Sequence, residues 1–414
     1  MLRAVSIVIQ PNPEILQMME ESRRIYDQAL YAQRQRYFET KNQGKIKTYN
    51  YNDLWSVVKS SEQYTDCGLD IGPKTYAIKQ VCTAWTSFIK AVKAYRKDPS
   101  KFTGRPKMPN YIYKRSNYNI VEIDSSRFRT KWCADNEVRV PNGKTVLRFP
   151  TWLKRSDIRQ IKMQFWYGKV KVSFIYDDKR YVDNKFTEGS AIGIDLGVNN
   201  LCAITSNDKN LSCVVKGGPV KSVNQFYNKK KAEIQAKLEV CNHSKASRRL
   251  SRLTRKRNNK IDNYMHCASK KIIDMCVENG VQKIIIGHND GWKQDVNMGS
   301  KNNQNFVQIP FSTLIEQIKY KAERYLNLEV VVVNESYTSK CDHLAFEEMC
   351  HHDNYLGKRV QRGLFVSSTG KRLNADINGA IGILRKGKAI TDAQLMGLRD
   401  RGDGVSPRVL IINP

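Results

Sequence analysis

Three short runs of apolar residues, each long enough for one buried strand, constrain the fold of this chain more than any other feature. They are AIGID at 191–195, KIII at 283–286 and LEVVVV at 328–333. Residues 201–206 follow the first run closely enough to form a hairpin with it, and residues 310–327 have helical periodicity. Strands that are apolar on both sides are typical of sheets covered by helices. The chain from about residue 186 onward is therefore predicted to be α/β.

The N-terminal part of the chain has a different pattern. Residues 2–9 alternate like a strand, whereas residues 14–97 have mostly helical periodicity. Segment 101–111, KFTGRPKMPNY, combines Gly, Pro and basic residues and is interpreted as a loop or a domain crossover. Alternating patterns return at 119–123, 146–150 and 160–176. With the first strand, these segments can close a small β-barrel or form an independent antiparallel sheet, and the pattern favours neither.

The charge of the chain points to a polyanionic partner. It carries 70 Lys and Arg against 40 Asp and Glu, a net charge of +30 with a pI near 9.7. Because such an excess repels itself unless a polyanion neutralises it, nucleic acid is the first partner to consider. Thirteen of the basic residues lie within 221–260, beside only two acidic ones. With a turn expected at 242–244, this region is predicted to be a helical pair along phosphates; the alternative is a solvated charged face.

Composition excludes several classes of protein. A hydrophobic fraction of 40%, with 20 Tyr, 13 Phe and 6 Trp, rules out an intrinsically disordered chain. No apolar run approaches the roughly 20 residues of a membrane-spanning helix, and we expect no secretion signal. The ten cysteines include no C-x-x-C pair, which is typical of thiols in a reducing compartment. We therefore expect an intracellular protein with no membrane partner.

Three acidic residues lie where a metal site would need them. Asp195 ends the first apolar strand, Glu335 follows the run of four valines, and Asp376 lies at the start of a predicted helix. A period of two places Glu335 on the same face as Val331 and Val333. Carboxylates at the ends of rigid elements suit Mg²⁺, and two such ions can clamp the attacking and leaving oxygens of a phosphodiester. For each residue alone, a helix cap or a solvated carboxylate is the simpler explanation.

Seven segments, spread along the C-terminal part of the chain, are informative when they are taken together and in order. They are AIGIDLGVNNLCAIT, NQFYNKKKAEIQ, RLSRLTRKRNNKIDNYMHCAS, IIIGHNDGWKQ, FVQIPFSTLIEQIKYKAE, ESYTSKCDHLA and GKRVQRGLFVSSTGKRLNADINGAIGILRK. Together they resemble the RuvC-like nuclease half of TnpB proteins, which are RNA-guided nucleases related to type V CRISPR effectors and to Fanzor proteins. The resemblance covers about residues 186–386. KFTGRPKMPNY is similar to the linker before that half, and the N-terminal region is similar in architecture only.

The resemblance implies a fold class and a domain organisation. The fold is an α/β RNase H-like (RuvC) nuclease domain plus a small β-barrel (wedge) domain with an inserted helical recognition domain. The expected bounds are 1–13 and 115–185 for the wedge-like β-barrel, 14–114 for the helical recognition domain with its linker, and 186–414 for the nuclease domain. Within the nuclease domain, 221–280 is expected to be a basic helical insert and 341–372 a degenerate zinc-ribbon-like insert.

The resemblance also assigns the nuclease site, with one departure. Asp195 matches the aspartate of the first strand and Asp376 the aspartate of the final motif. Where many relatives carry a glutamate directly after the second apolar strand, this chain has Gly287. We expect Glu335, one strand away, to take over the role, because Gly287 leaves the path of its side chain clear. Asp290 is the alternative ligand, and a dead site is the third possibility.

These matches give a set of predicted site residues and cofactors. The catalytic and metal-binding residues are Asp195, Glu335 and Asp376, with two Mg²⁺ ions. The nucleic-acid-binding residues are Lys229, Lys230, Lys231, Arg248, Arg249, Arg252, Arg255, Lys256 and Arg257. Relatives often carry two C-x-x-C pairs between the last two motifs, where this chain has Cys341, His343, Cys350, His351 and His352. Because the paired spacing of a zinc ribbon is absent, we do not expect zinc.

The leading hypothesis is an RNA-guided DNA endonuclease that cleaves guide-matched double-stranded DNA at a single RuvC site. Its partners are a guide RNA of the omega type and target duplex DNA, and we expect one protein monomer with one RNA. The protein is expected in the cytoplasm if it is prokaryotic and in the nucleus if it is eukaryotic or viral. One alternative is a nuclease-dead, RNA-guided DNA-binding repressor. The other is a nuclease or transposition accessory that uses no guide.

Overall fold

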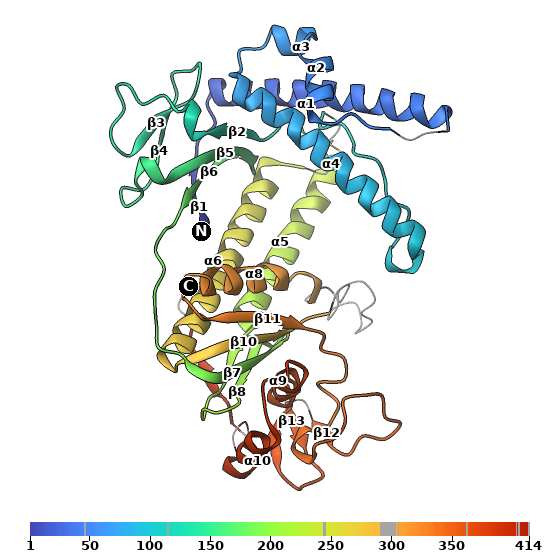
Figure 1. Cartoon of the computed structure of the whole chain (residues 1–414), viewed down its shortest axis with the longest axis vertical. Helices are drawn as coiled ribbons and strands as arrows, with labels where there is room; N and C mark the ends of the chain where they lie inside the picture. Colours follow the sequence, from blue (N-terminus) through green and yellow to red (C-terminus); the bar gives the residue numbers. More distant parts are fainter. Residues whose placement is uncertain are drawn as a thin grey trace. The chain divides into compact units, whose positions relative to one another are not determined.

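The structure, a computed structural model, describes residues 1–44, 47–113, 116–242, 246–289, 304, 306–361, 363–402, 404 and 406–412. The chain divides into two units, Met1–Lys179 and Arg180–Pro414 (Figure 1). In the described residues, no helix is both long and apolar enough to cross a membrane. The boundary between the units lies close to residue 186, where the pattern of the sequence changes.

Unit 1 contains a four-stranded antiparallel sheet in the order β1-β6-β5-β2. Its strands are β1 (Leu2–Ile9), β2 (Val121–Asp124), β5 (Ile158–Trp166) and β6 (Lys169–Asp177), and a separate pair is formed by β3 (Glu137–Arg139) and β4 (Val146–Arg148). The edge strands β1 and β2 are not hydrogen-bonded to each other in the described part of the chain. These four strands therefore form an open sheet and do not close into the expected barrel. The alternative, an antiparallel sheet, describes them better.

The helices of unit 1 lie between β1 and β2 in the sequence. They are α1 (Pro13–Asn42), α2 (Tyr51–Val58), α3 (Glu62–Thr65), α4 (Ile71–Lys97) and the short 3-10 turn η1 (Pro99–Lys101). Two further 3-10 turns, η2 (Ser125–Arg127) and η3 (Arg155–Asp157), follow β2 in the sequence. Asn12 and Asp70 cap the two long helices by accepting hydrogen bonds from the backbone of their first turns. Apolar residues at helical spacing, such as Ile78, Val81 and Trp85, are buried. The helical pattern expected for 14–97 is confirmed.

Unit 2 is built on a six-stranded mixed sheet in the order β11-β10-β7-β8-β9-β15 (Figure 1). The strands are β7 (Thr187–Leu196), β8 (Asn200–Ser206), β9 (Ser212–Lys216), β10 (Val281–Gly287), β11 (Glu329–Val333) and β15 (Arg408–Leu410). The strands β7, β8 and β9 form an antiparallel meander. β10 is parallel to β7, β11 is parallel to β10, and β15 is parallel to β9. The three strands and the hairpin predicted from the sequence are confirmed. The prediction that 328–333 is a buried strand is wrong, because β11 lies at the edge of the sheet and all its residues are half-buried or exposed.

Helices cover both faces of this sheet. They are α5 (Gly218–Asn242), α6 (Arg248–Glu278), α8 (Phe311–Ala322), α9 (Ala375–Lys386) and α10 (Asp392–Arg401); the turn η4 (His343–Ala345) and the small sheet of β12 (Lys358–Gln361), β13 (Leu364–Val366) and β14 (Arg372–Asn374) complete the unit. Ile192 and Ile194 pack in one core with residues of α6 and α8. Ala191 packs with Ile383 and Leu384 of α9 on the opposite face. Alternate residues of β7 therefore face different helical layers.

Candidate active site

Three carboxylates come from one end of the sheet and from the first turn of α9. Asp195 is the penultimate residue of β7 and shares the α9 face of the sheet with Ala191. Asp376 lies in the first turn of α9, which Asn374 caps by accepting from the backbone N–H of Asp376 at 2.9 Å. Glu335 follows β11, two residues after that strand ends at Val333. The negative charges of Glu335 and Asp376 both act on Asp195, so the three predicted residues lie within electrostatic range of one another.

Gly287 provides the space through which Glu335 reaches the other carboxylates. In the sheet, β10 lies between β7 and β11, and Gly287 pairs with Val333. A Cβ atom placed on Gly287 would lie 3.2 Å from Glu335 Oε2 and 2.5 Å from the side chain of Ile383. The Glu335 carboxylate therefore approaches the space that a side chain at position 287 would fill. This geometry agrees with the path that the sequence suggested.

Two further glycines allow α9 to lie directly against β7. A Cβ atom on Gly193 would lie 2.3 Å from the carbonyl oxygen of Ala380, and one on Gly379 would lie 2.8 Å from Asp195 Oδ2. Any larger residue at either position would push the helix away from the strand. Close packing at these glycines sets the distance between Asp195 and the helix that carries Asp376.

Asp195 and Glu335 are poorly solvated, which penalises the charged forms of both carboxylates. Burial, together with the charges of Glu335 and Asp376, raises the pKa of Asp195 well above its usual value, although Arg359 acts in the opposite direction. Burial raises the pKa of Glu335 to about 7. Its Oε2 atom is buried and has no hydrogen-bond partner in the described structure. A buried acceptor of this kind lacks the donor or cation that would offset its desolvation.

Several polar residues near the carboxylates were not predicted from the sequence. Asn200, at the start of β8, donates from Nδ2 to Asp376 Oδ2 at 2.8 Å. Arg359, on β12, places Nη2 3.5 Å from Asp376 Oδ1. Asn289 Oδ1 accepts from the backbone N–H of Glu335 at 2.9 Å, which fixes the start of the loop after β11. The only sequence signal for Asn200 and Asn289 was their position just beyond an apolar strand.

A chain of hydrogen bonds attaches the Glu335 segment to α9. Thr338 Oγ1 donates to the carbonyl oxygen of Glu335 at 2.7 Å, and the Thr338 carbonyl lies 2.6 Å from Nε2 of the buried His343. Since a carbonyl only accepts, Nε2 carries the proton, and Nδ1 accepts from Arg385 of α9 at 2.9 Å. Burial lowers the pKa of His343 to about 4, so the ring is neutral. Glu335 is thus held through backbone contacts and not only by strand packing.

The carboxylates suit Mg²⁺ by chemistry, although their side chains are not arranged as a metal-binding group. In the described residues, no group of three or more His, Cys, Asp or Glu side chains is placed to hold a metal ion. The three oxygen donors, the unpartnered Oε2 of Glu335 and the raised pKa of Asp195 all describe a site that a hard cation would stabilise. The alternative ligand Asp290 lies outside the described residues.

The Cys and His residues that follow Glu335 make separate contacts within the described part of the chain. His343 is in the chain described above, Cys341 donates to the carbonyl of Glu348 at 3.3 Å, and Cys350 Sγ lies 3.4 Å from His352 Nε2. Asp342 ties this segment to the β13–β14 turn, because its Oδ2 accepts from Ser367 Oγ at 2.9 Å and from the backbone N–H of Ser368 at 2.7 Å. Carboxylate hydrogen bonds therefore link the two loops of the insert; the expectation that zinc is not bound stays a prediction.

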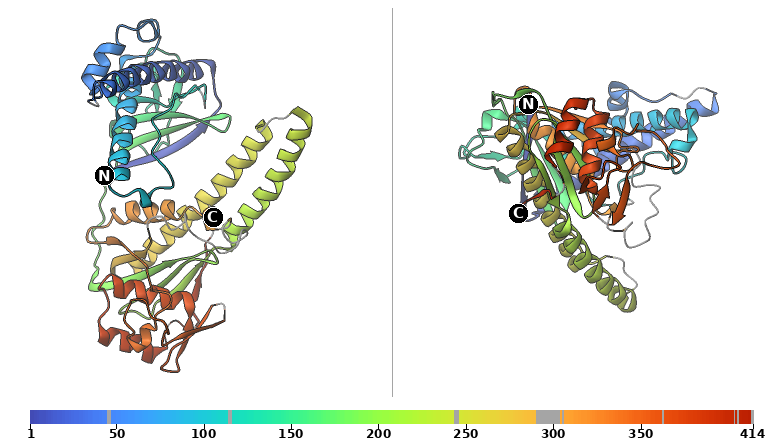
Figure 2. Two further views of the ribbon diagram at one scale, coloured as in Figure 1. Left: turned by 90° about the vertical axis from the view of Figure 1, so that its right-hand side faces the viewer. Right: turned by 90° about the horizontal axis from the view of Figure 1, so that it is seen from below.

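The predicted nucleic-acid-binding residues lie on α5 and α6, which extend from the sheet of unit 2 as a pair of helices (Figure 2). Arg248, Arg249 and Arg252 are exposed. Arg257 differs, since its guanidinium donates to Asn224 Oδ1 at 2.8 Å and to the carbonyl of Gln308 at 3.1 Å. Phosphate binding by Arg257 would have to compete with these internal contacts. Residues 243 and 244 of the predicted turn lie outside the described residues.

The raised pKa of Glu335 makes the stability of the metal-free protein depend on pH. A carboxyl with a pKa of about 7 in the folded state and about 4.5 in the unfolded state favours folding below pH 4.5, and this contribution is lost as the pH rises to 7. Glu335→Gln should therefore be more stable than wild type at about pH 8 in EDTA, by about 1–3 kcal/mol. The gain should shrink toward about pH 5. Asp195, Asp376 and Arg359 are unchanged in both proteins.

Urea unfolding of both proteins at the two pH values measures this difference. The control is Glu329→Gln, since Glu329 is an exposed residue of β11 whose carboxylate pairs with Lys283. A gain for Glu335→Gln of equal size at both pH values would contradict the assignment.

Comparisons with known proteins find similarity over much of unit 2. Residues 170–293 match the family model OrfB_IS605, described as "Probable transposase", and residues 311–383 match the Cas12f1-like TNB domain. The TnpB-like protein ORF457 of Acidianus two-tailed virus is 24% identical over 229 residues, which make up 53% of this chain and 47% of the viral protein. The match thus spans about half the length of that curated relative.

A solved structure shows that the fold resemblance extends further along the chain. The cryo-EM structure of a Cas12f1–sgRNA–target DNA complex has a TM-score of 0.53 with this chain at 16% sequence identity; the match covers 89% of this chain and 82% of the Cas12f1 chain. The fold and site define an α/β protein with three carboxylates against one mixed sheet. More specifically, the chain is TnpB-like: residues 170–293 are similar to the OrfB_IS605 family, and residues 311–383 are similar to the Cas12f1-like TNB domain.

Proposed function

We propose that this protein is an RNA-guided endonuclease that cleaves guide-matched double-stranded DNA at one site, formed by Asp195, Glu335 and Asp376. The observation that carries the proposal is the approach of Glu335 past Gly287 toward the two aspartates. The strand order of unit 2, with three antiparallel strands followed by two parallel ones, supports an RNase H-like (RuvC) nuclease fold. The likeness to a Cas12f1 complex that contains a guide RNA and target DNA supports the choice of partners.

In this proposal, the three carboxylates hold two Mg²⁺ ions. The ions supply Lewis acidity and stabilise charge on the attacking and leaving oxygens of the phosphodiester. The protein fixes the ligands: β7 and the packing of α9 position Asp195, Asn200 orients Asp376, and the Thr338–His343–Arg385 chain holds the backbone of Glu335. Arg359 lies 3.5 Å from Asp376 Oδ1 and partly neutralises its charge, so it would compete with a metal ion for that oxygen.

The charge of the protein supports a nucleic-acid substrate. Exposed arginines along α6 present cations at successive turns, and the chain has a net charge of +30. Phosphate contacts of this kind give affinity that depends on salt and not on base sequence, so the guide RNA would supply the sequence specificity. We further propose one protein monomer per RNA and an intracellular location, because both nucleic-acid partners are intracellular.

Reversing the charges of Arg248, Arg249, Arg252 and Arg255 to Glu should weaken nucleic-acid binding by about 10²-fold or more at moderate salt. The loss should be similar for unrelated sequences, and the slope of log affinity against log salt should fall by up to about 0.9 for each phosphate contact that is lost. Fluorescence anisotropy with guide RNA and with duplex DNA at several salt concentrations measures both quantities.

The control for the arginine variant reverses Lys270 and Lys271, which are exposed cations near the C-terminal end of the same helix. If the arginine variant keeps the affinity and the salt slope of the parent, α6 does not contact the phosphates.

The repressor remains the second candidate. It is favoured by Gly287, which stands where the resemblance to TnpB proteins implies a glutamate. Both candidates bind a guide RNA and matched DNA, and they differ only in cleavage. Incubating the purified protein with matched duplex and Mg²⁺ separates them, since only the nuclease gives products with new 5′ and 3′ ends.

A further inference from the structure

Unit 1 contains a cavity of about 620 Å³, and none of the residues that line it belongs to the carboxylate site. The segment 105–108 lines one part of it, and the long helices α1 and α4 line the rest. α1 contributes Arg34, Tyr37, Phe38 and Lys41, and α4 contributes Phe88, Ile89, Val92, Lys93 and Arg96. In both helices these residues are spaced by three and four positions, so each helix presents one continuous face to the cavity.

The charged part of the lining is cationic throughout. It consists of Arg34, Lys41, Lys93, Arg96, Arg105 and Lys107, and no Asp or Glu is among the lining residues. None of the six cations forms an ion pair within the described part of the chain, whereas nearby Lys101 pairs with Asp98. The Nε atom of Arg34 is buried without a hydrogen-bond partner, although its Nη2 donates to the carbonyl of Pro109 at 2.6 Å. Because these cations repel one another, an external anion would stabilise the cavity.

The apolar part of the cavity is aromatic and rigidly supported. The ring of Phe88 packs edge-on against Trp85 at 5.6 Å, and the ring of Tyr37 lies 5.2 Å from Trp85. Trp85 itself is fully buried in the core of unit 1. Rings fixed in this way offer a flat surface at little cost in conformational entropy.

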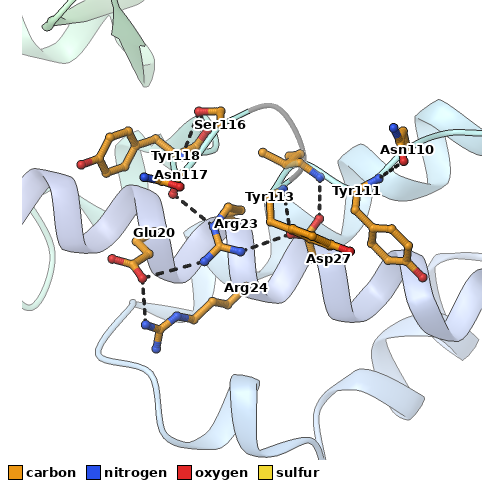
Figure 3. A network of polar contacts seen from close by, with 11 residues as sticks. Glu20, Arg23, Arg24, Asp27, Asn110, Tyr111, Tyr113, Ser116, Asn117 and Tyr118 are labelled. Carbon is orange, nitrogen blue, oxygen red and sulfur yellow. Dashed lines mark hydrogen bonds and ion pairs between the residues drawn. The ribbon is translucent and has the colours of Figure 1, made fainter. Parts of the chain in front are cut away.

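The segment that borders the cavity is fastened to α1 just beyond it (Figure 3). Asp27 accepts from the backbone N–H groups of Ile112 at 2.7 Å and Tyr113 at 3.2 Å, and Arg23 donates to the carbonyl of Asn117 at 3.1 Å. Arg34 forms a cation–π contact with Tyr111 at 4.7 Å. These contacts attach the linker to the middle of α1, beside the residues that line the cavity.

We propose that this cavity binds one unpaired nucleotide of a single-stranded nucleic acid, with the base against Phe88 and Tyr37 and its phosphates among the six cations. Aromatic rings bind bases by stacking, while Lys and Arg bind the phosphates on either side. The volume is within the range of small-ligand sites. The proposal deepens the proposed function, on which it rests, by assigning a base-binding role to the helical part of unit 1. An RNA strand and a DNA strand share this chemistry, and the experiment distinguishes them.

The test measures binding of the full-length protein to fluorescein-labelled adenylate strands of about 12 nucleotides, one RNA and one DNA. Phe88→Ala should weaken binding of at least one strand by about tenfold, because a stacked base is lost. Val92→Trp, which fills the cavity but keeps every cation and every native ring, should have a similar effect. The control is Tyr95→Ala, since Tyr95 is an aromatic residue of α4 that packs on Phe102 and does not line the cavity.

A DNA strand of the same length with abasic units throughout separates stacking from charge. Its affinity for Phe88→Ala and for the parent should be equal, because no base is present to stack. The strand that loses more affinity in the two cavity variants identifies the source of the nucleotide. The proposal is overturned if both variants bind both adenylate strands as tightly as the parent, or if abasic DNA loses as much affinity as adenylate DNA.

The experiments distinguish failure of the nucleotide-binding proposal from failure of the proposed nuclease function. If the cavity binds no nucleotide, Mg²⁺-dependent cleavage by the parent protein still stands. If the parent never cleaves matched duplex, the strand-binding results are unaffected.

Discussion

Glu335→Gln is expected to lower the rate of Mg²⁺-dependent cleavage of guide-matched duplex by about 10³-fold, which corresponds to about 4 kcal/mol of transition-state stabilisation. The substitution is nearly isosteric and removes one anionic ligand, so the Thr338–His343–Arg385 chain and the packing over Gly287 are retained. Affinity for guide RNA and for matched DNA should stay within about twofold of wild type, because phosphate contacts elsewhere supply it. Single-turnover cleavage assays and anisotropy measure the two effects separately.

The matched comparison is Asp290→Asn, which also removes one charge from a residue near the end of β10. It should cleave at nearly the wild-type rate, because Glu335 already occupies the space beside Gly287. Loss of cleavage in Asp290→Asn alone would move the third ligand to Asp290. Equal and large losses in both variants would mean that both residues are needed.

Asp195→Ala and Asp376→Ala should each reduce cleavage by about 10³-fold or more, since each removes an anionic ligand and leaves the basic surface unchanged. Guided binding of target DNA should persist in both variants. Asp195→Ala should also raise the stability of the protein in EDTA, because burial and two nearby carboxylates raise the pKa of Asp195 and penalise its charge.

Asp208→Ala is the matched control for the two aspartate variants. Asp208 also belongs to unit 2, but its carboxylate accepts hydrogen bonds from Ser190 and Ser206 and is not part of the carboxylate site. It should keep wild-type cleavage. Full activity in Asp195→Ala or Asp376→Ala would be incompatible with the proposed metal ligands.

The parts of the fold that the sequence predicted are those with strong periodicity. Apolar strands flanked by polar residues identified β7, β10 and β11, and helical spacing identified α1 and α4. The edge strand β15 is three residues long and carries no such pattern, and it is defined by its parallel pairing with β9. Whether the sheet of unit 1 closes depends on pairing between strands that are more than 100 residues apart in sequence, which local patterns do not encode.

The candidate site likewise contains residues whose positions local pattern predicted and residues whose positions depend on tertiary packing. The positions of Asp195 at a strand end and of Asp376 at a helix start were predictable from local pattern, and the strand period placed Glu335 on the face of the sheet that α9 covers. Their roles as metal ligands stay predictions. Arg359 was not predictable, because β12 approaches Asp376 only through the folding of the insert. The hydrogen bonds of Arg257 within the protein were not predictable either, because its partners Asn224 and Gln308 lie on other segments of the chain. Charge runs show that cations are present, but tertiary packing decides which of them face solvent.

The most direct test of the account is cleavage of a duplex chosen from the RNA that co-purifies with the protein. That RNA is sequenced, and a duplex matching its variable end is incubated with the purified complex in Mg²⁺ and in EDTA, beside a duplex with a scrambled target. The account predicts cleavage of the matched duplex in Mg²⁺ only, and none with Glu335→Gln. No cleavage of the matched duplex by the wild-type complex that binds it would contradict the nuclease and identify a guided repressor.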